Sequence, residues 1–121
     1  MENHDHPRMI NRYGSVKYRN ASAKSIANSC MLQCGTPFIY QGQEIGMTDI
    51  RLPELDMYED VSTYNAHRLY KSVLHLPEEK IMNIVKKRSR DNARTPVQWS
   101  NTKNAGFTTA DKPWFYINEN Y

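Results

Sequence analysis

The start of the sequence gathers side chains that could do chemistry. The run Glu2-Asn3-His4-Asp5-His6-Pro7-Arg8 holds two carboxylates, two imidazoles and a guanidinium. A carboxylate beside a histidine, in a loop at the end of a strand, can bind vicinal hydroxyl groups and stabilise a developing positive charge. The same composition is also typical of an ordinary polar loop, and the run alone leaves both interpretations open.

A basic stretch in the second half offers a different chemistry. Residues 1–60 carry 6 basic and 8 acidic side chains, whereas residues 61–121 carry 10 and 5. The excess peaks at Lys86-Lys87-Arg88-Ser89-Arg90-Asp91-Asn92-Ala93-Arg94, and such a cluster on a helix could bind nucleic-acid phosphates. It lacks the interleaved aromatic residues on which single-stranded bases stack. A solvated helix face is therefore the favoured interpretation, and we expect no nucleic-acid partner.

The cysteines and histidines do not form a metal-binding pattern. Cys30 and Cys34 are too few for a disulfide scaffold, and their spacing favours two reduced thiols on a buried helix face. The histidines do not complete a zinc spacing with them. We expect neither a metal nor a cofactor. The four histidines are His4, His6, His67 and His75.

The first half of the chain reads as loop, helix and strand. Residues 1–15 suggest the end of one element followed by a loop. Apolar residues recur at helical spacing over residues 20–34, where Asn20 or Ser22 can cap the start and Gly35 can end the helix. The aromatic and β-branched run over residues 36–41 predicts a short buried strand. The periodic helix residues are Ile26, Ala27, Cys30, Met31 and Cys34.

The second half reads as two helices between irregular segments. Residues 46–60 are rich in turn formers and acids, and the apolar spacing from Val61 to Leu74 predicts a helix. Pro77, at a first-turn position before two glutamates, opens another helix that should stop by Thr95. Residues 98–121 predict an ordered loop anchored by aromatic side chains. Its expected packing residues are Trp99, Phe107 and Trp114.

The length and composition limit what the chain can be. It has 121 residues, 39% of them hydrophobic, and is short of the ~250 residues that a complete α/β barrel needs. One strand and three helices do not close a fold, because a strand needs partners. We therefore expect a piece of an α/β fold. The sequence shows no apolar run of membrane-spanning length and no secretory signal at its start, so we expect no membrane partner and a cytoplasmic location.

Five blocks of sequence occur in one order along essentially the whole chain. They are Glu2 to Arg8, Gly35-Thr36-Pro37-Phe38-Ile39-Tyr40-Gln41-Gly42-Gln43-Glu44-Ile45-Gly46-Met47, the blocks Ser89 to Trp99 and Asn104 to Thr109, and the end from Pro113 to Tyr121. In content and spacing they resemble the α-amylase family of glycoside hydrolases, in its α-glucosidase and oligo-1,6-glucosidase branch. His6, Gln43 and Val97 depart from the usual residues of these blocks.

The resemblance implies an incomplete (β/α)8 barrel. It places the start of the chain at the end of the seventh strand, the seventh helix at residues 20–34 and the eighth strand at residues 36–41. The chain then divides into a barrel portion, 1–45, and an active-site excursion, 46–121. Active sites of such barrels lie at the C-terminal ends of the strands, so most of this chain would be active-site wall.

The resemblance also implies roles for individual residues. Asp5 matches the aspartate that grips the sugar hydroxyls and stabilises the oxocarbenium-like transition state, and His4 matches a histidine that binds the same sugar. Arg90 matches an arginine that closes the pocket around the terminal glucose; Arg94 is the alternative for that contact and is otherwise structural. Glu44 is either an acid near the substrate entrance or an acceptor that stabilises its loop.

Two essential groups of the family have no match here. A retaining glycosidase needs a nucleophilic carboxylate and an acid/base carboxyl group ~5 Å apart, and neither motif is present. The resemblance thus implies part of a retaining α-glucosidase that acts on the non-reducing ends of α-linked gluco-oligosaccharides and is inactive alone. The alternative is a non-catalytic scaffold or subunit of the same descent, although such proteins tend to lose Asp5. Exposed barrel faces would favour self-association. Linkage preference stays undecided.

Overall fold

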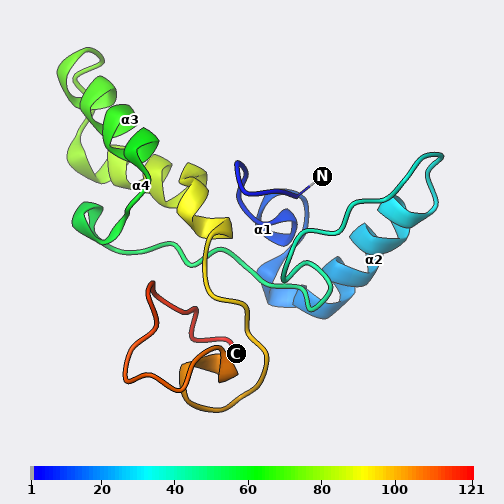
Figure 1. The fold of residues 1–121 in the computed structure, drawn as a ribbon. Coiled ribbons are helices and arrows are strands. Elements are labelled where there is room, and N and C mark those ends of the chain that lie inside the picture. The colour runs from blue at the N-terminus through cyan, green and yellow to red at the C-terminus, as the bar shows by residue number, and fades with distance from the viewer. Residues whose placement is uncertain (1) are drawn as a thin grey trace.

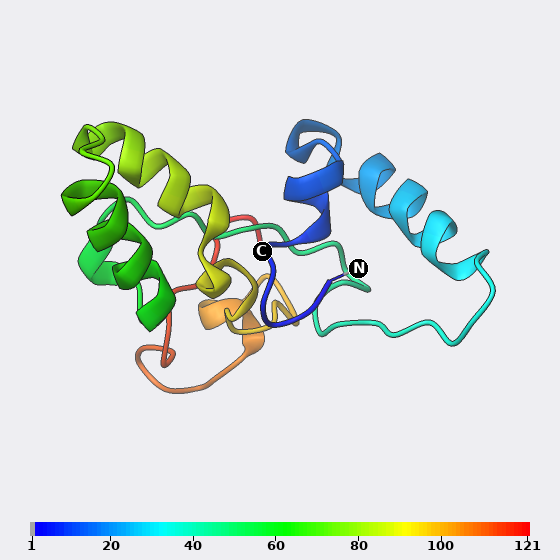
Figure 2. The ribbon, with the colours of Figure 1, turned by 90° about the horizontal axis from the view of Figure 1, so that it is seen from above.

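Two pairs of helices joined by long irregular segments make up the chain in the computed structural model, which describes residues 2–121 (Figure 1). The N-terminal pair is α1 (Met9–Tyr13) and α2 (Arg19–Met31), and the second pair is α3 (Val61–Ser72) and α4 (Glu78–Arg88). Figure 2 shows the pairs on opposite sides, with the irregular segments between them. Short 3-10 turns occur at Val16–Tyr18, Leu55–Met57, Arg90–Ala93 and Lys103–Gly106.

The helix predicted at residues 20–34 exists but has other ends. It begins at Arg19, because a 3-10 turn leads straight into it and makes Tyr18 the N-cap, with no side-chain cap from Asn20 or Ser22. It ends at Met31 with Leu32 as C-cap, so Gly35 lies beyond it. Cys30 is half-buried and Cys34 is exposed outside the helix, so the prediction of a shared buried thiol face is wrong.

The helix α1 lies where the sequence predicts the end of one element followed by a loop, and no helix. Its first N–H groups find acceptors on distant side chains: Asp49 Oδ1 accepts from the Arg8 N–H at 2.7 Å, and Glu2 Oε2 accepts from the Met9 N–H at 3.0 Å. These carboxylates satisfy groups that would otherwise be orphaned at the helix start. No local capping residue marks this helix in the sequence, which explains why the pattern does not reveal it.

The predicted strand at residues 36–41 is wrong for this chain. No strand occurs within residues 2–121, and the residues from Thr36 to Ile39 lie extended on an outlying loop after α2 (Figures 1 and 2). Phe38 is 86% exposed rather than buried. A strand forms only when neighbouring strands take up its N–H and C=O groups, and no partner lies beside this segment in the described residues.

The two helices predicted in the second half are confirmed. The first spans Val61–Ser72 with Asp60 as N-cap, and the second spans Glu78–Arg88 with Pro77 one position earlier than expected, at the N-cap. They lie side by side (Figures 1 and 2). Glu78 and Glu79 face the positive end of the α4 dipole, while the basic residues of the cluster sit near its negative end. No helix in the described part of the chain has the length and apolar character needed to cross a membrane.

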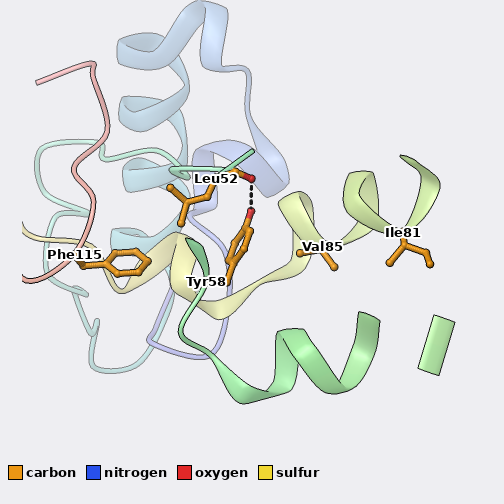
Figure 3. Close-up of a cluster of buried hydrophobic side chains, with 5 residues drawn as sticks. All are labelled: Leu52, Tyr58, Ile81, Val85 and Phe115. Carbon is orange, nitrogen blue, oxygen red and sulfur yellow. Dashed lines mark hydrogen bonds between the residues drawn. The ribbon is translucent and has the colours of Figure 1, made fainter. Parts of the chain in front are cut away.

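The main hydrophobic core gathers on one face of α4. Ile81 and Val85, four residues apart and so on the same side of the helix, are both buried. Figure 3 shows them with Leu52, Tyr58 and Phe115, and the Tyr58 hydroxyl donates to the Leu52 carbonyl at 2.9 Å. The core therefore joins α4 to the segment before α3 and to the C-terminal segment.

The C-terminal segment is irregular, as predicted, but a different aromatic residue anchors it. Phe115 is 6% exposed, whereas Trp99 and Trp114 are 67% and 61% exposed and Phe107 is also exposed. The prediction that these three pack inward is wrong. Amides hold the segment in place instead: Asn118 Nδ2 donates to Thr48 Oγ1 at 2.9 Å and to the Asp49 carbonyl at 3.0 Å.

Candidate active site

The N-terminal loop presents His4 and Asp5 at the surface. Asn3 shapes the loop, because its Oδ1 accepts from the Asp5 N–H at 2.9 Å. This is the local turn that asparagine side chains favour. His4 and Asp5 both point outward, and His4 Nε2 lies 3.4 Å from Asp5 Oδ2. The predicted pair is thus adjacent and accessible.

A buried arginine holds this loop against the rest of the chain. Arg8 is fully buried and its Nη1 pairs with Glu2 Oε1 at 2.6 Å. The same guanidinium donates to the carbonyls of Gln41, at 2.6 Å, and Ala93, at 3.3 Å. One side chain therefore joins three segments far apart in sequence. Tyr40 covers its face, with the guanidinium carbon 5.2 Å from the ring centroid.

The turn that Arg8 contacts needs a glycine. Gly42 has φ +82°, in the region that other residues rarely adopt, and a Cβ there would collide with the Met47 side chain. Glu44 follows on this turn and is exposed. Within residues 2–121 no hydrogen bond or ion pair joins Glu44 to Asp5 or His4. The structure therefore does not bring Glu44 into the cluster.

Arg90 and Arg94 converge on Asp5. Arg90 Nη1 donates to Asp5 Oδ1 at 3.2 Å and Arg94 Nη2 donates to the same oxygen at 3.3 Å. Arg94 Nε also donates to the His4 carbonyl at 2.8 Å, which fixes the loop that carries Asp5. The arginines come from the 3-10 turn after α4 and the residue that caps it, more than eighty residues from Asp5. Four of the five predicted site residues thus meet.

The carboxylate of Asp5 is left half open. Its side chain is 48% exposed, and both guanidinium groups bind Oδ1. Among residues 2–121, no arginine hydrogen bond reaches Oδ2, and His4 Nε2 lies 3.4 Å from it. An ionised carboxylate accepts about four hydrogen bonds, so Oδ2 can still accept from ligand hydroxyls. Asp5 also lines an open cleft of about 680 Å³ together with Arg12, Arg51 and Lys87.

Asp60 orients Arg90 from the other side. Arg90 Nε donates to Asp60 Oδ2 at 2.9 Å and Nη2 donates to Oδ1 at 2.5 Å, a bidentate pair. Burial by itself would raise the pKa of Asp60, but the hydrogen bonds from Arg90 and Ser62 outweigh it and hold that pKa well below its usual range. The hydrogen bond to Asp60 in turn raises the pKa of Arg90. Both groups are therefore charged at neutral pH.

Sequence reasoning missed Asp60 and the structural role of Arg8. A helix cap was a readable signal at Asp60, which directly precedes Val61, but its pairing with Arg90 thirty residues later leaves no local pattern. Arg8 stood in a recognised block, yet its burial depends on Gln41 and Ala93, which only the folded chain supplies. As for metals, no group of three or more His, Cys, Asp and Glu side chains within residues 2–121 is arranged to hold an ion.

Comparisons with known proteins identify the family to which this chain belongs. The family profile described as "Alpha amylase, catalytic domain" matches residues 1–121. The chain belongs to the α-amylase family of glycoside hydrolases, and its homology is with the α-glucosidase branch. The oligo-1,6-glucosidase of Halalkalibacterium halodurans is 45% identical over 120 residues, which cover 98% of this chain and 21% of the relative.

Solved structures agree with that assignment. The trehalose-6-phosphate hydrolase of Bacillus licheniformis superposes with a TM-score of 0.90 at 45% identity, over 99% of this chain and 21% of that chain. The isomaltulose synthase of Klebsiella sp. LX3 superposes with a TM-score of 0.92 at 41% identity, over 98% and 22%. This chain therefore has the fold of a piece of these barrel enzymes. It spans about a fifth of the length of the relatives it matches.

Proposed function

We propose that the chain supplies one wall of the active site of a retaining α-glucosidase of the oligo-1,6-glucosidase type. The observation that carries the proposal is the arrangement of Asp5, whose Oδ1 is held by Arg90 and Arg94 while Oδ2 remains accessible beside His4. A carboxylate fixed in this way can accept hydrogen bonds from two neighbouring sugar hydroxyls. Its charge then stabilises the positive charge that develops at the anomeric carbon.

The remaining site residues take supporting roles in this proposal. His4 donates to the same glucosyl unit, and Arg90 offers to sugar oxygens the N–H groups that Asp60 and Asp5 do not engage. Arg94 holds the loop through the His4 carbonyl, which favours a structural role for it. Glu44, exposed on its turn, lies near the substrate entrance. The nucleophile and the acid/base belong to parts of the barrel outside this chain, and the reaction uses no cofactor.

The proposal includes an assignment of the elements to the barrel. Residues 1–45 correspond to the end of the seventh strand, the seventh helix and the eighth strand, and residues 46–121 to the excursion that follows. Support comes from the superposition on barrel enzymes over nearly the whole chain. The extended residues 36–39 take the place of the eighth strand, and α2 takes the place of the seventh helix.

A hybrid enzyme tests the function. The segment of the Halalkalibacterium halodurans oligo-1,6-glucosidase that matches this chain is replaced by residues 1–121, a change supported by 45% identity over 120 residues. We expect the hybrid to hydrolyse isomaltose and to release glucose with the α configuration, which NMR of the fresh product detects.

The matched control is the same hybrid with Asp5→Asn. A hybrid that melts cooperatively yet hydrolyses no α-glucoside would contradict the proposal and favour a non-catalytic scaffold or subunit. A hybrid equally active with and without Asp5→Asn would contradict the role given to Asp5.

A further inference from the structure

Asp60, which is not among the predicted site residues, forms a bidentate ion pair with Arg90. The Asp60 carboxylate is 1% exposed, and it binds the guanidinium through both oxygens, at 2.9 Å to Nε and 2.5 Å to Nη2. Only Nη1 of Arg90 reaches Asp5, at 3.2 Å. Because a guanidinium is planar and rigid, fixing two of its nitrogens fixes the direction of the third.

Asp60 is itself held by groups on two sides. The N–H groups of Glu59 and Asp60 donate to Asp91 Oδ2 at 2.8 and 2.9 Å, and Asp91 is buried. On the other side Ser62 donates to Asp60 through its N–H at 3.2 Å and through its hydroxyl. The carboxylate thus stands at the N-cap of α3 and has little freedom to turn away from Arg90.

We propose that Asp60 is a positioning residue, which aims Arg90 at Asp5 and so couples the start of α3 to the glucosyl-binding site. This inference rests on the proposed function, because it assigns a part in the same site. Asp60 does not touch the substrate. It sets the direction of the Arg90 guanidinium, which does touch the substrate. Arg90 and Arg94 share Asp5 as a partner, and the negative charge of Asp60 neutralises the positive charge that would otherwise remain in excess.

A cap on α3 is the competing role for Asp60, and one substitution separates the two. Asp60→Asn keeps an oxygen that can accept from the Ser62 N–H, and asparagine is as good an N-cap as aspartate. It removes the charge and one of the two acceptors of Arg90. In the hybrid enzyme, Asp60→Asn should lower kcat by about 100-fold, the cost typical of a misplaced group, with a smaller effect on KM. The melting temperature should change little.

Ser62→Ala is the matched control. It removes the hydroxyl that also binds Asp60 but leaves both bonds to Arg90 in place, so kcat should stay close to that of the unsubstituted hybrid. Equal losses of kcat in Asp60→Asn and Ser62→Ala, matched by equal losses of melting temperature, would assign Asp60 to the cap alone and overturn the proposal.

A double-mutant cycle with Arg90 tests whether Asp60 acts through that residue. In an Arg90→Ala background, Asp60→Asn should have no further effect on kcat, because the group that it positions is gone. A loss as large as in the presence of Arg90 would overturn the proposal. A folded but inactive unsubstituted hybrid would instead contradict the proposed function.

An NMR measurement on the 121-residue chain tests the positioning of Arg90 without any measurement of activity. The Arg90 Nε–H signal should be shifted and protected from exchange with water in the unsubstituted chain and in Ser62→Ala, and should lose both properties in Asp60→Asn. An Arg90 signal that is the same in Asp60→Asn as in the unsubstituted chain would overturn the proposal whatever the hybrid does.

Discussion

The oxygens of Asp5 have different surroundings. Oδ1 accepts hydrogen bonds from two arginines, whereas Oδ2 accepts none from them within the described part of the chain and lies 3.4 Å from His4 Nε2. Bonds to Oδ1 fix the plane of the carboxylate and leave Oδ2 for a ligand. A preorganised acceptor of this kind pays little reorganisation when charge develops nearby.

Substitution of Asp5 by asparagine removes the negative charge of the side chain and keeps its shape. In the hybrid enzyme, Asp5→Asn should lower kcat by several powers of ten and leave the melting temperature unchanged, because the lost charge counts mainly in the transition state. Steady-state kinetics on isomaltose and a thermal melt give the two values. A kcat within about tenfold of the unsubstituted hybrid would contradict the role of transition-state stabiliser.

Asp49 makes stability depend on pH. Burial raises its pKa to about 6, against the lowering effects of the hydrogen bond from the Arg8 N–H and of Arg51. The folded state then binds a proton more tightly than the unfolded state, so this group costs stability as pH rises from about 4 to about 6. Asp49→Asn should remove a cost of up to about 3 kcal/mol at pH 7 and leave stability at pH 4 nearly unchanged.

Denaturant unfolding of the hybrid with and without Asp49→Asn, at several pH values, measures that difference. The paired comparison cancels the titration of all other groups. If the difference in the free energy of unfolding between the two proteins stays constant from pH 4 to pH 7, the pH dependence assigned to Asp49 is contradicted.

Among the elements, α1 depends most on distant residues. Five residues are too few for a helix to persist on its own, and this one is held at its start by Glu2 and Asp49. Glu2 also neutralises the fully buried Arg8. The helix and the loop that carries Asp5 therefore depend on the same carboxylate.

Removal of the Glu2 charge should show this dependence. Glu2→Gln leaves Arg8 buried without its partner, and breaking a buried pair costs about 3–5 kcal/mol. In the hybrid, the free energy of unfolding should fall by roughly that amount. The exposed Glu44→Gln is the matched control and should change stability by less than about 0.5 kcal/mol. Similar small losses in both variants would show that the Glu2–Arg8 pair carries no net stability.

The elements also differ in how well the sequence predicts them. The helices α3 and α4 were predictable because their signals are local: the apolar spacing from Val61 onward for α3, and the start at Pro77 with Glu78 and Glu79 for α4. The strand at residues 36–41 was not, since strand formation depends on neighbours that the described chain does not supply. Likewise His4, Asp5, Arg90 and Arg94 followed from family blocks, whereas Asp60 emerged only from its contact with Arg90.

For the molecule as a whole, the chain alone should be inactive. It has the carboxylate that we propose stabilises charge at the anomeric centre but no matched nucleophile or acid/base, and positioning without them cannot complete a double displacement. Purified chain should release no p-nitrophenol from p-nitrophenyl α-glucoside beyond a matched blank. Turnover that grows with the amount of purified chain would contradict this prediction.

Exposed apolar groups should make the chain associate with itself. Phe38, Ile39 and Leu32 lie exposed around the outlying segment after α2, whose N–H and C=O groups lack strand partners among the described residues. Unpaired extended backbone and apolar side chains favour pairing with another copy. Size-exclusion chromatography with light scattering should detect oligomers, and Phe38→Lys should reduce them. A monodisperse 14.2 kDa species that binds no hydrophobic dye would contradict the prediction.

The contacts of Asp5 with Arg90 and Arg94 join positions 85 and 89 residues apart. Closing a loop of that length costs more chain entropy than forming a local helix does. Chains rich in such distant contacts fold slowly. We therefore expect the helix pairs to form early and Asp5 to meet its arginines late in refolding. During synthesis, the loop that carries Asp5 precedes Arg90 and Arg94 by 85 and 89 residues, so it cannot meet these partners until they have been made. A ligand that needs the assembled site would therefore bind only in the last kinetic phase.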